Sequence, residues 1–444
     1  MKPRLSSLIG ILAAVCAVGG ICPLATNGCH KAQSDAPTPP TSAASKKFAG
    51  KQLNIILANH PWSEALEPML EDFKKATGME LTISHYPEDQ LSQKLQIGLT
   101  AGSNRADVFM LRPLQEARQF AENHWLADLL PHAQSDKDWN WSDFQEAARD
   151  TVTFDKAVYG VPVVTEREMV YYRKDLFDKA GLQPPATLDE LKAAAAKLND
   201  PAHGMAGIVM RGQRAPSVTQ FSSFLYSFGG DWTKDGKSML DSPEALTAYK
   251  FYGGLLKNYG PQGALNMSWP QGLAVFQQGK AAMWIDADVF YPSLIDPAKS
   301  TVTASVGFAP FPQGPAGARN YNVTSWALGI NESSPEKAAA AWEFVQWATS
   351  APVVMALQQK GVPGARLSVW NSPDGLKGFP EACARVIQIQ VKRGVGHDRP
   401  RVIKVGVARD IVGDPVVTAI QGGDIEASVK RAHEQFSAFL QQDK

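Results

Sequence analysis

Along the first part of the chain, short apolar segments that are typical of strands alternate with segments whose apolar residues recur at helical spacing. Three of them are rich in β-branched and aromatic residues, which is typical of strands; they are 53–59 (LNIILAN), 80–86 (ELTISHY) and 106–111 (ADVFML). Two segments between them repeat apolar residues at helical spacing and are predicted helices, 63–78 and 89–102. This β-α-β-α-β order predicts an α/β fold, with a parallel sheet and helices packed on it.

The same alternation continues through the rest of the chain. Thr187 and Glu190 stand in capping-box spacing and predict the start of a helix. Further predicted strands are 169–172 and 207–212, and further predicted helices are 221–232, 333–349 and 424–440. With 444 residues, of which 44% are apolar, the chain is too long for one hydrophobic core, so we expect two lobes.

Polar side chains follow the predicted parallel strands. Asn59 and His60 come directly after the first strand, and Arg112 follows the third. In sheets of this kind ligands bind beyond the carboxyl ends of the strands. These residues are therefore candidates for a binding site, with a plain surface loop as the alternative for His60.

The segment 281–290 (AAMWIDADVF) carries an indole and two carboxylates on a predicted strand. Asp286 and Asp288 would lie on one face of that strand, roughly 7 Å apart. Such a pair is either the acid and base of a glycoside hydrolase or part of a site that binds sugar hydroxyls without chemistry. Core packing is the alternative for Trp284 and a helix cap for Asp288. Burial of a carboxylate without a partner is costly, which favours a ligand or hinge contact for Asp286.

Composition narrows the range of partners. The chain has 44 Lys and Arg against 44 Asp and Glu, so no basic excess points to nucleic acid. Its eight His residues are scattered, and after Cys29 the only cysteine is Cys383, so we expect no metal site and no cofactor. The sequence also lacks G-x-S-x-G, H-E-x-x-H and phosphate-loop motifs. A binding protein is therefore favoured over an enzyme.

The first 28 residues have the pattern of a signal peptide. Lys2 and Arg4 precede the apolar run 8–22, which is shorter than the ~20 residues that a spanning helix needs. A short membrane anchor is the alternative. We expect export to the periplasm or the cell surface.

Residues 29–49 are rich in Pro, Ser, Ala and Thr and are predicted to form a flexible linker. Cys29, at the head of this segment, stands where a bacterial lipoprotein is lipidated. Thr26 and Asn27 depart from the usual residues before such a cysteine, so ordinary signal-peptide cleavage stays open as the alternative.

Six blocks of sequence carry a resemblance to a known family. They are YGVPVVTEREMVYYRKDLFDKAGLQPPATLDEL (159–191), LYSFGGDW (225–232), FQQGKAAMWIDADVF (276–290), VGFAPFP (306–312), SWALGINESSPEKAAAAWEFVQWATS (325–350) and GVPGAR (361–366). In this order they resemble the family 1 extracellular solute-binding proteins, the receptor components of bacterial sugar ABC importers. Within that family the chain is most similar to the sorbitol/mannitol (polyol) branch.

The resemblance implies a two-lobe periplasmic-binding-protein fold of type II, like that of maltose-binding protein, with hinge strands and a central cleft. The implied lobes are 50–163 with 287–328, and 164–286 with 329–444. The implied crossing segments lie near 161–165, 285–288 and 327–330.

The resemblance also implies a function. A sugar or sugar alcohol would be captured by closure of the lobes and delivered to ABC permease subunits in the cytoplasmic membrane, by a monomer without a cofactor. The alternatives are an exported glycoside hydrolase and a receptor for a non-sugar solute such as a polyamine or a metal ion.

Candidate ligand-binding residues follow from residue type and position. Carboxylates and guanidiniums bind sugar hydroxyls, and aromatic rings cover the C–H faces. The expected set is Asn59, His60, Glu166, Arg211, Trp269, Trp284, Asp286, Trp326 and Arg366. Glu166 matches a ligand-binding acid of the family, whereas a structural salt bridge is the alternative for Arg211. The roles of Arg167 and Glu168 are left unassigned.

Overall fold

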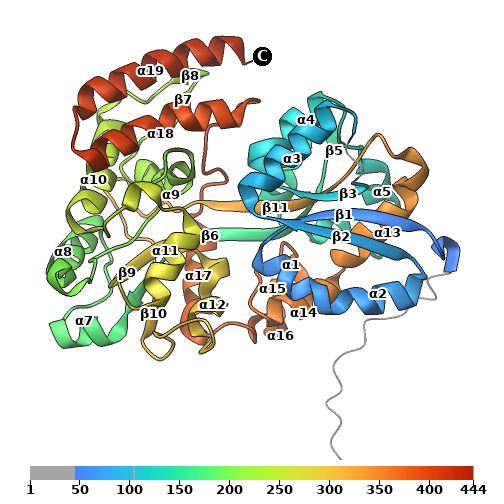
Figure 1. The fold of residues 1–444 in the computed structure, drawn as a ribbon, viewed down its shortest axis with the longest axis horizontal. Coiled ribbons are helices and arrows are strands. Elements are labelled where there is room, and N and C mark those ends of the chain that lie inside the picture. The colour runs from blue at the N-terminus through green and yellow to red at the C-terminus, as the bar shows by residue number, and fades with distance from the viewer. Residues whose placement is uncertain (1–45, 104–105, 444) are drawn as a thin grey trace, which may run out of the picture. The chain divides into compact units, whose positions relative to one another are not determined.

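A mixed β-sheet runs through both halves of the computed structural model, which describes residues 46–103 and 106–443 (Figure 1). Among these residues it has seven strands: β1 (Gln52–Ala58), β2 (Glu80–Tyr86), β3 (Val108–Leu111), β6 (Val161–Arg173), β9 (Met283–Ala287), β10 (Val306–Pro310) and β11 (Asn322–Ile330). Their order is β10-β6-β11-β3-β1-β2, and β9 pairs with the far end of β6. Since β1 is parallel to both β2 and β3, the predicted β-α-β-α-β unit is confirmed.

Two long strands connect the halves of the fold (Figure 1). The first half of β6 pairs with β11, and its second half pairs with β9 and β10. The strand β11 continues from there to β3. Because both strands pass from one half into the other, they have the position of the expected hinge strands.

The first lobe is built around β1, β2 and β3. Its helices are α1 (Pro61–Leu66), α2 (Leu70–Thr77), α3 (Glu88–Thr100), α4 (Arg118–Glu122), α5 (Leu130–Ser135), α6 (Glu146–Asp150), α13 (Ala338–Ala348), α14 (Ala351–Gln359), α15 (Leu367–Trp370) and α16 (Pro373–Leu376) (Figure 1). A π-helical turn, η3 (Pro113–Ala117), leads from β3 into α4.

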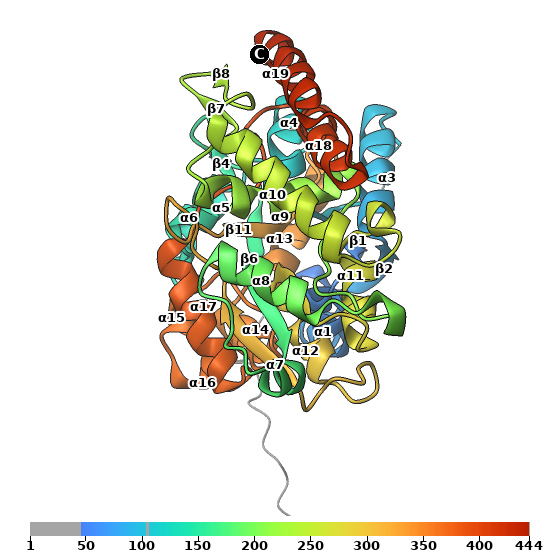
Figure 2. The same ribbon diagram turned by 90° about the vertical axis from the view of Figure 1, so that its left-hand side faces the viewer.

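The second lobe contains β9, β10 and the far end of β6. Its helices are α7 (Lys174–Ala180), α8 (Leu188–Leu198), α9 (Arg214–Ser227), α10 (Pro243–Tyr259), α11 (Trp269–Gln277), α12 (Tyr291–Ile295), α17 (Glu381–Arg393), α18 (Val405–Gln421) and α19 (Ile425–Gln442) (Figures 1 and 2). The helix α18 packs against α9, α10 and α19. The predicted capping box is confirmed at the start of α8, where Glu190 N donates to Thr187 Oγ1 at 3.1 Å.

The packing differs from the predicted lobe boundaries at two segments. The helix α13 was expected in the second lobe, yet Phe344 and Trp347 lie 5.5 and 4.8 Å from the ring of Phe73 on α2. Conversely, β10 was expected in the first lobe but pairs with the far end of β6. The reason is that β9 and the turn after it stay beside β6, so the chain does not change lobe near residue 287. The remaining boundaries stay a prediction.

The predicted segments before residue 46, including Cys29, lie outside the described residues. None of the described helices combines the length and the apolar character needed to cross a bilayer. Cys383 is buried in α17.

Candidate ligand-binding cleft

A polar cleft lies where side chains from both lobes meet. Its inner chamber has a volume of about 40 Å³, and it is lined by His60, Glu88, Arg112, Glu166, Arg211, Thr219, Trp269, Phe290, Tyr321, Val323, Ser325, Trp326, Asp398 and Arg399. These residues come from β6, β11 and both lobes. Five of the nine predicted binding residues are therefore brought together here.

His60, Glu166 and Trp326 form one wall of the inner chamber. His60 caps the start of α1, where its Nδ1 accepts a hydrogen bond from Trp62 N at 3.1 Å. Because Nδ1 is an acceptor, Nε2 carries the proton, and it lies 3.4 Å from Glu166 Oε1. The His60 ring is 5.7 Å from the ring of Trp326. Asn59 is exposed and lines an adjoining outer chamber instead.

Arg211 lies on the opposite side of the chamber and is held by Asp286. Its Nε donates to Asp286 Oδ2 at 3.0 Å, and Gln220 Nε2 donates to the same carboxylate at 2.7 Å. Asp286 is fully buried and does not line the chamber, which corrects its predicted role. Burial raises the pKa of Asp286, and the Arg211 guanidinium opposes that rise. Asp286 therefore positions the Arg211 guanidinium and does not itself face a ligand.

Trp269 joins the two lobes at the mouth of the inner chamber. Its ring stacks on Phe290 at 4.8 Å with an interplanar angle of 15°. Its Nε1 donates to Glu88 Oε2, at the start of α3 in the first lobe, at 3.2 Å. A flat aromatic face and a charged acceptor therefore stand side by side, which is the chemistry a sugar ring or polyol chain requires.

The structure places Trp284 in the core and not in the cleft. It is fully buried on β9, and its ring stacks on Tyr171 at 5.1 Å. The pairing of Tyr171 with Trp284 on adjacent strands fixes both side chains on the same face of the sheet, inside the apolar core. The packing alternative thus holds for this residue.

Arg366 also lies away from the cleft. It is 1% exposed, donates to Thr349 O at 2.6 Å and to Trp139 O at 2.8 Å, and pairs with Asp143 at 3.0 Å. These bonds occupy its guanidinium inside the first lobe. The predicted ligand contact of Arg366 is therefore replaced by a structural role.

The two residues that follow Glu166 on β6 are buried in the protein interior and do not line the cleft. Arg167 and Asp288 are both fully buried, and Arg167 Nε donates to Asp288 Oδ2 at 2.6 Å. Glu168 is fully buried as well, and burial raises its pKa well above the usual value. Neither Arg167 nor Glu168 lines the cleft. Since Asp286 and Asp288 are each paired with an arginine, the acid and base arrangement considered for this stretch is not formed.

The cleft also contains residues that the sequence did not single out. Asp398 and Arg399 follow α17 and pair with each other, with Arg399 Nε 2.7 Å from Asp398 Oδ1. Arg399 also donates to Gln115 Oε1 in the first lobe at 3.0 Å. Tyr321 stands at the start of β11 with its hydroxyl buried and without a hydrogen-bond partner among the described residues. No periodicity marks these residues, because their chain segments meet only in the folded molecule.

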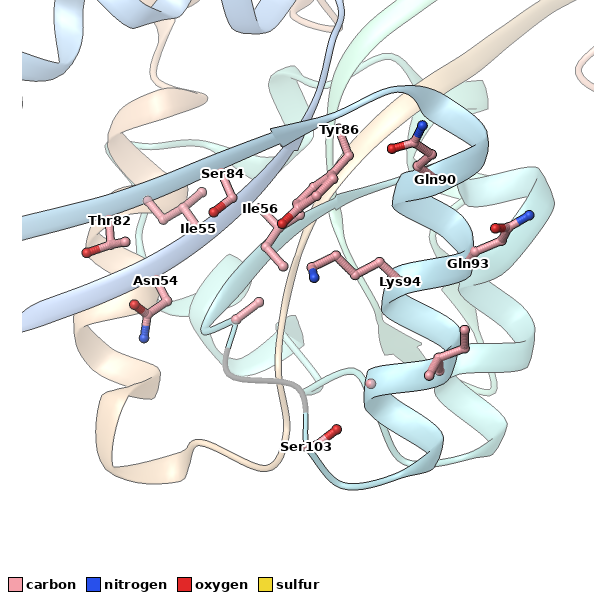
Figure 3. A pocket seen from close by; sticks show the side chains of 13 residues that line it. Asn54, Ile55, Ile56, Thr82, Ser84, Tyr86, Gln90, Gln93, Lys94 and Ser103 are labelled. Atoms are coloured by element: carbon pink, nitrogen blue, oxygen red, sulfur yellow. The ribbon is translucent and has the colours of Figure 1, made fainter.

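A larger groove lies on the first lobe alone. Figure 3 shows it between α3 and the sheet, with Tyr86, Lys94 and Gln93 along it. Its volume is about 720 Å³, and Lys94 Nζ lies 5.0 Å from the centre of the Tyr86 ring. None of the nine predicted binding residues lines it. The cleft, which gathers residues from both lobes, is therefore the better candidate for the ligand.

Comparison with known proteins agrees with this fold and cleft. Residues 59–355, more than half of the chain, match the family described as bacterial extracellular solute-binding protein. The chain therefore belongs to the bacterial extracellular solute-binding proteins. Several of the relatives it resembles carry polyol names.

The chain is 32% identical over 294 residues to a mannitol-binding protein of Pseudomonas aeruginosa, a match that covers 64% of this chain and 66% of the relative. It spans slightly less than two thirds of that relative's length. Two solved structures are similar over 88% of this chain and 99% of theirs. One is an ABC transporter solute-binding protein of Agrobacterium radiobacter K84 in complex with ribitol, at 26% identity and a TM-score of 0.80. The other is from Agrobacterium vitis S4 with bound D-mannitol, at 28% identity and a TM-score of 0.77.

Proposed function

We propose that this protein is the extracytoplasmic binding component of a carbohydrate or polyol ABC importer. The observation that carries the proposal is the inner chamber, in which His60, Glu166, Arg211 and two indoles from both lobes surround one small polar space. Ligand sites of this kind lie at lobe interfaces and combine apolar faces with a few placed polar groups. The polyol names of the relatives support the same class of ligand.

The binding residues proposed here are a subset of the predicted ones. Glu166 and His60 accept from and donate to ligand hydroxyls on one side, and Arg211 donates on the other. Trp269 and Trp326 cover the C–H face of the ligand. Asn59 lines only the outer chamber, so it contacts the ligand only if the ligand extends into that chamber.

Closure of the lobes is the proposed mechanism of capture. The inner chamber of about 40 Å³ is much smaller than a polyol, so the lobes must separate for entry. A ligand that touches both lobes stabilises the closed form through contacts that the open form lacks. The closed form then docks on the permease subunits of the importer.

Export and attachment complete the proposal. The N-terminal segment directs the chain out of the cytoplasm, and lipidation of Cys29 anchors it at the membrane surface. The protein acts as a monomer, needs no cofactor and catalyses no reaction on the bound sugar.

Thermal unfolding of residues 50–444 with a panel of ligands tests the proposal. We expect one of sorbitol, mannitol, xylitol, trehalose, maltose or the common hexoses to raise the melting temperature, because a ligand that binds only the folded form stabilises it by mass action. Thin-layer chromatography of each incubation should show no product. Turnover of a glycoside would instead establish the enzyme alternative.

A further inference from the structure

We propose that the outer chamber of the cleft binds an anionic group, a carboxylate or a phosphate, carried by the sugar or polyol. The natural ligand would then be an acidic sugar derivative and not a neutral polyol. This inference rests on the proposed function and specifies the class of ligand.

The outer chamber adjoins the inner one and is large enough for such a group. Its volume is about 470 Å³, and it shares Glu88, Arg112, Arg211 and Trp269 with the inner chamber. The two chambers are therefore adjacent, and a group carried by a ligand bound at His60 and Trp269 would lie next to the outer chamber.

Four helices begin at the wall of the outer chamber. Residues from the starts of α3, α9, α11 and α18 line it, and each of these helices has at least nine residues. The first-turn N–H groups of a helix have no partner within the helix, and the helix dipole places partial positive charge at that end. In α9, α11 and α18, all fully described, no Asp or Glu stands in the first turn to offset this charge.

Arg409 provides a full positive charge at the same wall. It is 6% exposed on α18 and donates to Ala215 O at 3.0 Å, Gln115 Oε1 at 3.0 Å and Thr219 Oγ1 at 3.4 Å. All three acceptors are neutral, and among the described residues Arg409 forms no ion pair. Burial and the nearby guanidiniums of Arg399 and Arg112 lower the pKa of Arg409 well below its usual value. An anion beside Arg409 would offset the unfavourable free energy of burying its positive charge next to other guanidiniums.

The other guanidiniums of the cleft already have carboxylate partners. Arg211 pairs with Asp286, Arg399 pairs with Asp398, and Arg112 pairs with Glu88 and Glu116. Among the described residues, Arg409 is therefore the cleft arginine without a carboxylate at ion-pairing distance, and the charges of Asp398 and Glu88 act on it only from further away.

Two carboxylates line the outer chamber and bear on the charge balance. Glu88 is engaged by Arg112 and by the indole N–H of Trp269. Asp89 is exposed to solvent, where water screens its charge. Of the three guanidiniums at the lining, those of Arg112 and Arg211 are matched by Glu88, Glu116 and Asp286, so among the described residues the positive lining charge without an ion pair is that of Arg409.

Isothermal titration of residues 50–444, the same chain as in the thermal unfolding test, with D-mannitol, D-mannonate and D-mannitol 1-phosphate tests the inference. We expect at least one of the two acids to bind about tenfold more tightly than mannitol at low ionic strength, as a charge-assisted contact provides. That preference should shrink in high salt. Comparison of the D-mannonate titration with the D-mannitol 1-phosphate titration shows whether the anionic group is a carboxylate or a phosphate.

Variants then locate the anion site. Arg409→Gln should lower the affinity for the preferred acid more than the affinity for mannitol, whereas Arg409→Lys should keep part of the preference. Arg401→Gln, at an exposed arginine outside both chambers, is the matched control and should change neither affinity.

Two outcomes would overturn the inference and are distinguishable. If mannitol binds and both acids bind equally or more weakly in the wild-type chain, the anion site is excluded while the proposed function stands. If none of the three ligands binds, and none of the neutral panel raises the melting temperature, the proposed function fails together with this inference.

Discussion

At the scale of single residues, some polar side chains line the cleft, and others lie behind them and hold them in place. Arg211 lines the chamber, whereas Asp286 lies behind it, fully buried, and fixes the guanidinium together with Gln220. Residue type alone does not distinguish the two roles, because a carboxylate suits either one. Burial and partner decide between them.

Replacement of Asp286 by alanine should therefore reduce both stability and affinity. From the sequence alone, a loss of affinity at an unchanged melting temperature is expected. The structure predicts instead a loss of about 3–5 kcal/mol in the free energy of unfolding, because Arg211 is left as a buried charge without its partner. Urea unfolding and titration with the ligand found in the screen measure the two effects.

The matched control for this variant is Asp175→Ala. Asp175 pairs with Arg173 near the surface and is about half exposed, so its loss should cost less than about 1 kcal/mol. An Asp286→Ala protein as stable as the wild type would contradict the role of Asp286 in holding Arg211.

At the scale of elements, segments of the first lobe meet segments of the second across the cleft. Gln115 on η3 accepts hydrogen bonds from both Arg399 and Arg409, each at 3.0 Å. Glu88 at the start of α3 accepts from Trp269 on α11. These bonds join the lobes directly, so in the proposed mechanism the closed form would not depend on ligand contacts alone.

Replacement of Gln115 by alanine should weaken ligand binding by about tenfold. Two hydrogen bonds from guanidiniums stabilise the closed form, and their loss shifts the free protein towards the open form, which the ligand must then reverse. Isothermal titration measures the affinity, and small-angle scattering of the free protein should show a larger radius of gyration.

Gln119→Ala, one turn further along the same segment, is the control and should bind as the wild type does. Unchanged affinity and an unchanged radius of gyration in the Gln115 variant would mean that these bonds do not set the balance between open and closed forms.

At the scale of the whole molecule, buried ion pairs make stability depend on pH. Burial alone would raise the pKa of Asp398, but the Arg399 and Arg409 guanidiniums outweigh it and hold the pKa at about 2. A carboxylate whose pKa is lower in the folded than in the unfolded chain adds stability above its unfolded pKa. That stability is lost as the pH falls through the folded value.

The free energy of unfolding should accordingly fall between about pH 4 and pH 2. The part due to Asp398 is of the order of 2 kcal/mol. Urea unfolding across this range should show the gap between wild type and Asp398→Asn narrowing by that amount. Asp138→Asn, at an exposed position, should leave the pH dependence of the wild type unchanged. A constant gap between the wild type and the Asp398 variant would contradict this account.

The sequence by itself determined the local elements and the class of fold. The strands at 53–59, 80–86 and 106–111 and the capped helix after Thr187 follow from apolar period and capping chemistry, which are properties of neighbouring residues. Resemblance over ordered blocks identified the family, and residue type found His60, Glu166, Arg211, Trp269 and Trp326, which the structure gathers around one chamber.

Only the tertiary structure decided which polar and aromatic residues face the cleft. Trp284 and Arg366 have suitable chemistry, but strand pairing and carbonyl partners place them in the interior. Arg399 and Arg409 both donate to Gln115 across nearly 300 residues of chain, and no local pattern encodes such a meeting. The physical reason is that binding sites depend on long-range contacts, whereas sequence periodicity reports only the neighbourhood of each residue.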